Sequence, residues 1–208
     1  MTEKTPTVFI VDDDPSVRKA LKRLIESVGL EVETLTSAQE FSDQEQPDKP
    51  SCLVLDVRMP GLSGLDLQDE LAARGLNMPI IFITGHGNIP MGVRAMKAGA
   101  VDFIEKPFDD QALLDAIHQA IEQDRKARLE QAKIREILRR VGLLTHRERQ
   151  VFALVVTGIF NKQIAFELGT SEKTIKVHRA RIMQKMQAKS LADLVRLAEK
   201  AGVYPPKV

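Results

Sequence analysis

The sequence predicts two domains: an α/β domain on a five-stranded, doubly wound parallel sheet, then an all-α domain of four helices containing a helix-turn-helix. Three observations predict this. In the first 122 residues, five short apolar runs alternate with segments of helical period. From residue 142 onward the strand pattern disappears and helical segments follow one another. The net charge also changes sign, from −9 over residues 1–121 to +7 over residues 142–208.

The five apolar runs are the expected strands. They read TVFIV, EVETL, CLVLD, PIIFIT and AVDFIEK in chain order. Strands that alternate with helices form parallel sheets covered by helices on both faces. The second run has charges at alternate positions and therefore suits an edge. Right-handed crossovers then favour the order 2-1-3-4-5, which is the flavodoxin-like arrangement.

Helices are expected between these strands. The segment from Pro15 to Gly29 places Val17, Leu21 and Ile25 on one stripe, with proline near its start and glycine at its end. The segments GLDLQDELAARG and IPMGVRAMKAGA behave in the same way. These segments supply the crossover helices that a parallel sheet requires.

A long segment without glycine or proline precedes Gly142 and predicts a helix that leaves the sheet. Its first part keeps an apolar stripe from Leu113 to Ile121, whereas 11 of the 19 residues from Glu122 to Arg140 are charged. We interpret the charged part as an exposed helical linker. A coiled coil is the alternative, although its heptad seam is interrupted. The expected boundaries are 1–122, 123–141 and 142–208.

Four helices are expected in the basic part. Thr145 and Glu148 form a capping box before the first, which Gly158 ends. The second is the short segment NKQIAFELG, in which we expect Asn161 to be the N-cap. SEKTIKVHRARIMQKM and SLADLVRLAEKAG supply the third and fourth. Two helices joined by a short turn containing glycine suggest a helix-turn-helix.

Polar residues follow the apolar runs at one edge of the expected sheet. Asp12 and Asp13 end the first strand, Asp56 the third, Thr84 the fourth and Lys106 the fifth. Taken singly, each has a plain structural explanation as a turn or capping residue. Their convergence at the carboxyl ends of the strands, where such sheets bind ligands, indicates a functional site.

The chemistry of this edge suits phosphoryl transfer. Clustered carboxylates repel one another unless a hard cation such as Mg²⁺ binds them. The Lys106 ammonium and the Thr84 hydroxyl add a positive charge and a hydrogen-bond donor for phosphoryl oxygens. A carboxylate can act as the nucleophile. Asp14, which precedes Pro15, is instead expected to cap the following helix.

The third helix of the basic part has the pattern of a DNA-reading helix. Ile175, Ile182 and Met186 form its inward stripe. Its other face carries cations, an amide and small apolar groups: Lys173, Lys176, Val177, Ala180, Arg181 and Gln184. Such side chains can contact base edges and phosphates in a major groove. A solvated helix face is the alternative, which the preceding short helix and the +7 charge disfavour.

The motifs VDDD, LVLDVRMPGLSG, FITG and EKPF occur in order, and residues 5–122 resemble the receiver domain of two-component response regulators. The resemblance implies that Asp56 accepts a phosphoryl group from a histidine kinase. It implies that Asp13, Asp56 and the backbone carbonyl of Arg58 bind Mg²⁺, or Mn²⁺ in its place. Asp12 then acts through metal-bound water.

The same resemblance assigns roles to residues around the phosphoryl group. Lys106 pairs with it, and the bond from Lys106 to Pro107 is usually cis. Thr84 moves toward it and Phe103 rotates inward, where many receivers have tyrosine. Arg58 and His86 flank the group and control the access of water.

The basic part resembles the LuxR-type DNA-binding domain in the motifs NKQIA.ELG, S..T.KVH...I..KM and S...LV. A receiver followed by this module resembles the FixJ/NarL class of bacterial transcriptional regulators, with FixJ-like members the closer comparison. The expected function is phosphorylation-dependent transcription control, with homodimerisation, promoter DNA and RNA polymerase as partners. The residues expected to contact DNA are Lys162, Lys173, Thr174, Lys176, Val177, Arg179, Ala180 and Arg181.

Two other functions fit parts of the sequence. A metal-dependent phosphatase of the aspartyl-phosphate type uses a similar acidic cluster, but it typically has an acid two residues after the nucleophile, where this chain has Arg58. A helical module that docks protein rather than DNA is the second. The single cysteine, Cys52, and the absence of signal-peptide and membrane-span patterns suggest the cytoplasm.

Overall fold

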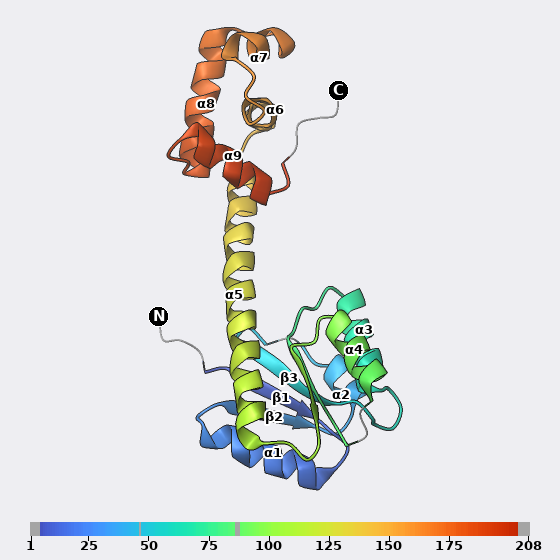
Figure 1. Ribbon diagram of the computed structural model, residues 1–208. Helices are drawn as coiled ribbons and strands as arrows, with labels where there is room; N and C mark the ends of the chain where they lie inside the picture. The colour runs from blue at the N-terminus through green and yellow to red at the C-terminus, as the bar shows by residue number, and fades with distance from the viewer. Residues whose placement is uncertain (1–4, 46, 86–87, 204–208) are drawn as a thin grey trace. The chain divides into compact units, whose positions relative to one another are not determined.

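The computed structural model describes residues 5–45, 47–85 and 88–203 of the chain. These residues form two compact units, one up to Arg128 and one from Leu129 onward. The division falls inside one long helix, α5 (Asp110–Gly142), coloured from green to yellow in Figure 1. Each unit has its own hydrophobic core and is described separately below.

The first unit contains a five-stranded parallel sheet. Its strands are β1 (Thr7–Val11), β2 (Glu31–Leu35), β3 (Ser51–Asp56), β4 (Ile80–Thr84) and β5 (Asp102–Glu105). They lie in the order β2-β1-β3-β4-β5, which confirms the predicted doubly wound topology. The half-polar β2 is an edge strand, as predicted. All five carboxyl ends point the same way because every pairing is parallel.

Helices cover both faces of this sheet. They are α1 (Pro15–Ser27), α2 (Ala38–Ser42), α3 (Gly64–Ala73), α4 (Ile89–Lys97) and the first half of α5. Residues of α1 and α5 pack on one face, and residues of α2, α3 and α4 pack on the other. The short α2 was not singled out by the sequence pattern. Its N-cap is Ser37, whose side chain accepts a hydrogen bond from the Glu40 N–H.

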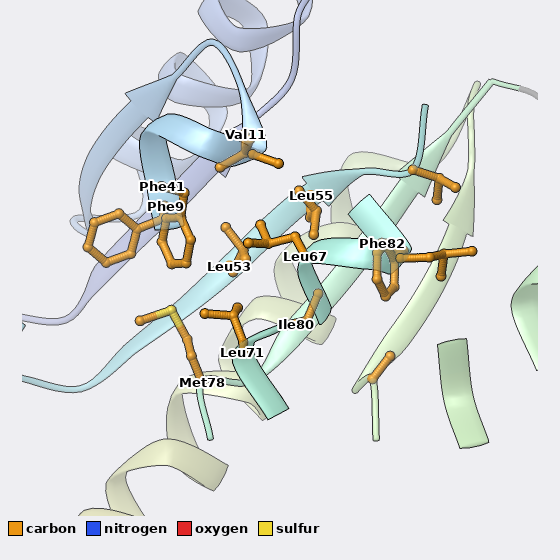
Figure 2. Close-up of a cluster of buried hydrophobic side chains, with 14 of the residues drawn as sticks. Phe9, Val11, Phe41, Leu53, Leu55, Leu67, Leu71, Met78, Ile80 and Phe82 are labelled. Carbon is orange, nitrogen blue, oxygen red and sulfur yellow. The ribbon is translucent and has the colours of Figure 1, made fainter. Parts of the chain in front are cut away.

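The apolar strands supply two cores because neighbouring residues in a strand face opposite sides. One core joins strand residues such as Leu53 and Phe82 to Phe41 and Leu67 of the helices, as Figure 2 shows. Phe9 and Phe41 meet edge to face, with ring centroids 5.4 Å apart. The other core buries Ile25 of α1 and Ile117 of α5 completely. This burial holds the carboxyl ends of the strands in register.

One charged residue of α5 is buried, although the sequence predicts an exposed helix there. Asp124 is 5% exposed, and its Oδ2 accepts a hydrogen bond of 2.9 Å from the Ser51 N–H at the start of β3. The Arg128 Nε donates to the same oxygen at 2.6 Å. An unpaired backbone N–H at the end of a buried strand is costly, so this carboxylate satisfies it and fixes α5 to the sheet.

The second unit is entirely helical among the described residues. Besides the last part of α5 it contains α6 (His146–Val155), α7 (Asn161–Glu167), α8 (Glu172–Met186) and α9 (Leu191–Lys200). Ile175, Ile182 and Met186 are fully buried, as their helical spacing predicts. Ile137 of α5 joins the same core and is 5% exposed.

An ion pair between the buried Glu148 and the partly exposed Lys185 connects α6 to α8. The predicted capping box is present, with Thr145 and Glu148 each bonding the backbone N–H of the other. The Glu148 Oε2 also accepts a hydrogen bond of 2.6 Å from the Lys185 Nζ. Burial of Glu148 raises the pKa of its carboxyl, but these bonds outweigh burial and hold the pKa below its usual value. The carboxylate therefore stays charged in the folded chain.

The start of α7 differs from the prediction. Phe160, not Asn161, is the N-cap, and its N–H donates to the Gln163 Oε1 at 3.3 Å. Asn161 lies inside the helix, and its side-chain oxygen accepts from Arg179 at 2.6 Å. The glutamine three residues after Phe160 replaces the expected asparagine cap, which leaves the asparagine oxygen available to another helix.

Two further features concern the environment of the chain. Cys52 is fully buried in β3, and desolvation, with a smaller contribution from the charge of Asp124, raises the pKa of its thiol well above the usual value. Among the described helices, none is long and apolar enough to cross a membrane.

Gly64 at the start of α3 is required by a close backbone approach. A Cβ on Gly64 would lie 2.3 Å from the Asp56 carbonyl oxygen, which is far inside van der Waals contact. We expect Gly64→Ala to lower the free energy of unfolding of the first unit by about 1–3 kcal/mol, measured by urea denaturation. Gly85→Ala is the control, because a Cβ there meets nothing within 4 Å. Equal losses in both variants would contradict this role.

Candidate metal centre and nucleic-acid interface

Three carboxylates lie together at the carboxyl edge of the sheet. Oxygens of Asp12, Asp13 and Asp56 all lie within 4.8 Å of one another. β1 and β3 are adjacent, so the residues that follow and end them become neighbours. The Asp12 side chain is fully buried and that of Asp56 is 12% exposed, whereas Asp13 is exposed. The sequence-predicted acidic residues therefore form one cluster open to solvent on one side.

The Lys106 ammonium joins two of these carboxylates. Its Nζ lies 2.8 Å from the Asp12 Oδ2 and 3.3 Å from the Asp56 Oδ2. Lys106 directly follows β5, and its N–H donates to the Thr84 carbonyl at 2.8 Å. The peptide bond from Lys106 to Pro107 is cis, as the resemblance implies. The Lys106 side chain therefore extends from the end of β5 past β4 to the carboxylates that follow β1 and end β3.

The electrostatics of the cluster follow from burial and pairing. Desolvation raises the pKa of the Asp56 carboxyl above its usual value, against the opposing effects of the Arg58 N–H and the Lys106 charge. Burial lowers the pKa of Lys106, but the hydrogen bond and charge of Asp12, and then those of Asp56, leave that pKa raised. Three carboxylates and one ammonium leave an excess of negative charge, which a divalent cation would offset.

Backbone and helix contacts hold the acidic residues in place. The Asp12 Oδ1 accepts a hydrogen bond of 2.8 Å from the Asp14 N–H, and the Asp56 Oδ1 accepts one of 3.1 Å from the Arg58 N–H. Asp14 caps α1 through the Ser16 N–H, as predicted. Arg18 was not found by sequence reasoning. Its Nη1 donates to the Asp12 carbonyl at 2.6 Å, and only its position one turn into α1 could have suggested this.

Thr84 and Phe103 lie on the neighbouring strands β4 and β5, with Phe103 opposite Phe82 in the register. Thr84 is fully buried at the end of β4, next to β3 and β5. The Phe103 ring lies 6.2 Å from the Phe82 ring and packs against Gly92 of α4. His86 lies outside the described residues.

The metal ligands expected from the sequence fit a hard cation. Carboxylate oxygens from two strands, open to solvent on one side, match the oxygen ligands and retained waters that Mg²⁺ prefers. The group of Arg58 that is predicted to bind the ion is its backbone carbonyl. The backbone N–H of the same residue donates to Asp56. The role of the carbonyl as a ligand stays a prediction.

In the second unit, α7 and α8 carry all eight residues expected to contact DNA. Lys162, Lys173, Ala180 and Arg181 are exposed, and Val177 is 46% exposed. Thr174 is also exposed, but its hydroxyl and N–H both bond the Ser171 side chain in the cap of α8. The outward face of α8 thus has the composition that its sequence predicts.

Two of the expected basic contact residues also have partners. The Lys176 Nζ lies 3.2 Å from the Glu172 Oε1, one turn earlier on α8, and both side chains are exposed. Arg179 is half-buried and donates to Asn161 of α7. Sequence reasoning missed Glu172, although its spacing of four residues from Lys176 is the signal that could have found it.

Comparisons with known proteins agree with this geometry. Residues 8–118 match the response regulator receiver domain, and residues 142–198 match the luxR family of bacterial regulatory proteins. Nodulation protein W of Bradyrhizobium diazoefficiens is 55% identical over 94% of this chain and 86% of its own length. The transcriptional regulatory protein FixJ of Azorhizobium caulinodans is 47% identical over 99% of this chain and 97% of its own.

Solved structures give the same result. The response regulator StyR is 52% identical, with a TM-score of 0.82 over 95% of this chain and 100% of the StyR chain. Full-length FixJ from B. japonicum is 45% identical, with a TM-score of 0.58 over 97% and 98% of the two chains. The chain therefore belongs to the two-component response regulators that join a receiver domain to a LuxR-type DNA-binding domain, and it is a transcriptional regulator of that family.

Proposed function

We propose that Asp56 is the phosphoacceptor of this response regulator. The observation that carries the proposal is the contact of Asp56 with Lys106 inside the acidic cluster. A carboxylate oxygen of Asp56 attacks the phosphorus of a phosphohistidine, the P–N bond breaks, and the imidazole nitrogen keeps the bonding electron pair. The Lys106 ammonium then pairs with a phosphoryl oxygen. A receiver domain implies a histidine kinase as the donor.

We propose that Asp13, Asp56 and the Arg58 carbonyl would hold the cation, with Asp12 acting through metal-bound water, and that the ion is Mg²⁺ with Mn²⁺ as its substitute. The donor set supports this, since all three side chains offer hard oxygens within 4.8 Å of one another. When bound, the ion offsets charge on the phosphoryl oxygens. Asp12 also keeps the Lys106 ammonium in the site through its bond of 2.8 Å.

We further propose that phosphorylation promotes pairing of two receivers through α4, β5 and the start of α5. Exposed apolar residues support this surface: Ile89 is 84% exposed, and Val93 and Met96 are each 46% exposed on α4. Phe103 of β5 packs against Gly92 of the same helix, and β5 pairs with β4, which ends at Thr84. Arg94 of α4 donates to Asp69 of α3 at 2.7 Å in the isolated chain.

A LuxR-type domain implies duplex DNA as the ligand of the second unit. We propose that residues 142–208 bind promoter DNA, that 123–141 link them to the receiver of residues 1–122, and that RNA polymerase is a further partner. Lys176 and Val177 lie toward the start of α8, where helix-turn-helix proteins meet base edges. Lys162, exposed in α7, suits a phosphate contact.

The phosphoacceptor is tested with a small phosphodonor such as acetyl phosphate. We expect Asp56→Ala to abolish acid-labile incorporation, measured by intact-protein mass spectrometry, because the variant lacks the nucleophile. Asp13→Ala should weaken Mg²⁺ binding in calorimetry, whereas the helix cap variant Asp14→Ala should change it much less. Wild-type incorporation in Asp56→Ala would refute the assignment.

The pairing surface is tested by sedimentation with and without beryllofluoride, which mimics the phosphoryl group. We expect the mimic to raise the dimer fraction of the wild-type chain, and Val93→Glu to prevent this because it places a charge in an apolar contact. Val28→Glu is the matched control, since Val28 is 43% exposed at the C-cap of α1. Equal monomer content in the free and mimic-bound wild-type chain would exclude this mechanism.

The reading helix is tested by titrating the phosphorylated chain with a duplex selected from random sequences and with a scrambled duplex. Lys176→Ala should cost about 1–3 kcal/mol on the selected duplex and relax preference at one position. Lys162→Ala should weaken both duplexes similarly and reduce the salt slope by about one. If Lys176→Ala weakens the two equally, Lys176 is a phosphate contact.

A further inference from the structure

A hydrogen bond joins the two helices of the helix-turn-helix at a point away from their turn. The Arg179 Nη1 donates to the Asn161 Oδ1 at 2.6 Å, and both residues are half-buried. Arg181, two residues further along α8, is exposed instead. Arg179 is therefore directed toward α7, while its neighbour is directed toward solvent.

This bond attaches the two helices to each other at a second point, apart from their turn. At the turn, the Thr170 N–H donates to the Ala165 carbonyl at 2.9 Å, and Gly169 has a φ of 60°. Asn161 lies at the other end of α7, about 10 Å from the turn, and Arg179 lies about 10 Å along α8 from its start. Two attachments this far apart restrict the angle between α7 and α8, whereas the turn alone would let the helices pivot about it.

Apolar packing of α7 is limited, so a directional bond matters there. Only Ile164 and Ala165 of its seven residues are buried in the part of the chain that the structure describes. Phe166 of the same helix is 91% exposed. A hydrogen bond from a charged guanidinium is roughly twice as strong as one between neutral groups. The bond to Arg179 therefore supplies orientation that two buried side chains do not.

We infer that Arg179 is a positioning residue for DNA reading, and that it acts through Asn161 rather than by contacting a base or a phosphate. By fixing the angle of α8 against α7, the bond aligns Lys176 and Val177 with their base pairs while Lys162 contacts a phosphate of the DNA backbone. The inference rests on the proposed function of α8 as the reading helix. It replaces the direct DNA contact that the sequence suggested for Arg179.

The test compares the selected and scrambled duplexes for the phosphorylated full chain. Asn161→Ala leaves the charge unchanged, so it should lower the ratio of the two affinities about tenfold, a loss of about 1.4 kcal/mol, without changing the salt slope. Arg179→Gln should lower the ratio by a similar factor, and the double variant should lower it no further. Arg181→Gln is the charge-matched control, and it should weaken both duplexes alike and reduce the salt slope.

Rescue separates positioning from loss of folding. Asn161→Asp keeps an acceptor for Arg179, so the affinity ratio should stay at the wild-type value. Both affinities should fall by the same factor, because the added negative charge is repelled by the DNA phosphates. Circular dichroism at the titration temperature verifies that each variant is folded. Asn161→Asp continues to test the inference if Asn161→Ala unfolds.

Three results would overturn the inference. The first is a wild-type affinity ratio in Asn161→Ala, and the second is an Arg179→Gln variant that matches Arg181→Gln on both duplexes and in salt slope. The third is a loss of the ratio in Asn161→Asp equal to that in a folded Asn161→Ala. A wild-type chain without preference for the selected duplex would instead overturn the proposed function, and the inference with it.

Discussion

The contact of one ammonium with two carboxylates organises the receiver. Asp12 is fully buried, and a buried carboxylate without a partner would cost several kcal/mol. Lys106 supplies that partner from the opposite side of β3 and β4, so the strand order, the acidic cluster and the end of β5 depend on one another. Because the same ammonium also reaches Asp56, any group added to Asp56 changes a charge balance in which the rest of the sheet edge takes part.

Much of this arrangement could be predicted from the sequence, for a physical reason. Apolar runs define buried strands, parallel topology places their carboxyl ends together, and Asp12, Asp56, Thr84 and Lys106 are then neighbours by construction. Asp124 could not be predicted, since a charge in a charged segment normally faces water. Its burial depends on the Ser51 N–H, which is 73 residues away in the sequence. That N–H needs an acceptor only once the sheet is assembled.

The second unit shows the same limit at shorter range. Helical spacing identifies the inward stripe of α8 correctly, yet it assigns every outward or bordering cation the same role. In the structure two of these cations differ: Lys176 pairs along its own helix, whereas Arg179 bonds a neighbouring helix. Lys185, to which the spacing assigned no role, bonds the buried Glu148. Spacing within one helix reports which side a residue lies on. Its partner depends on which helix packs beside it. At α7 the N-cap is Phe160 rather than Asn161, so the Asn161 side chain is available to accept a hydrogen bond from Arg179.

The burial of Cys52 has a practical consequence for spectroscopy. It is the single cysteine of the chain, it is fully buried in β3, and desolvation keeps its thiol protonated. Thiol-directed reagents react with accessible thiolates. A cysteine introduced at an exposed position of α4 or α8 would therefore take up a maleimide dye or a nitroxide selectively, with the native thiol left in place. With one such cysteine in each unit, distances between the two units can be measured by energy transfer or electron resonance without removing Cys52.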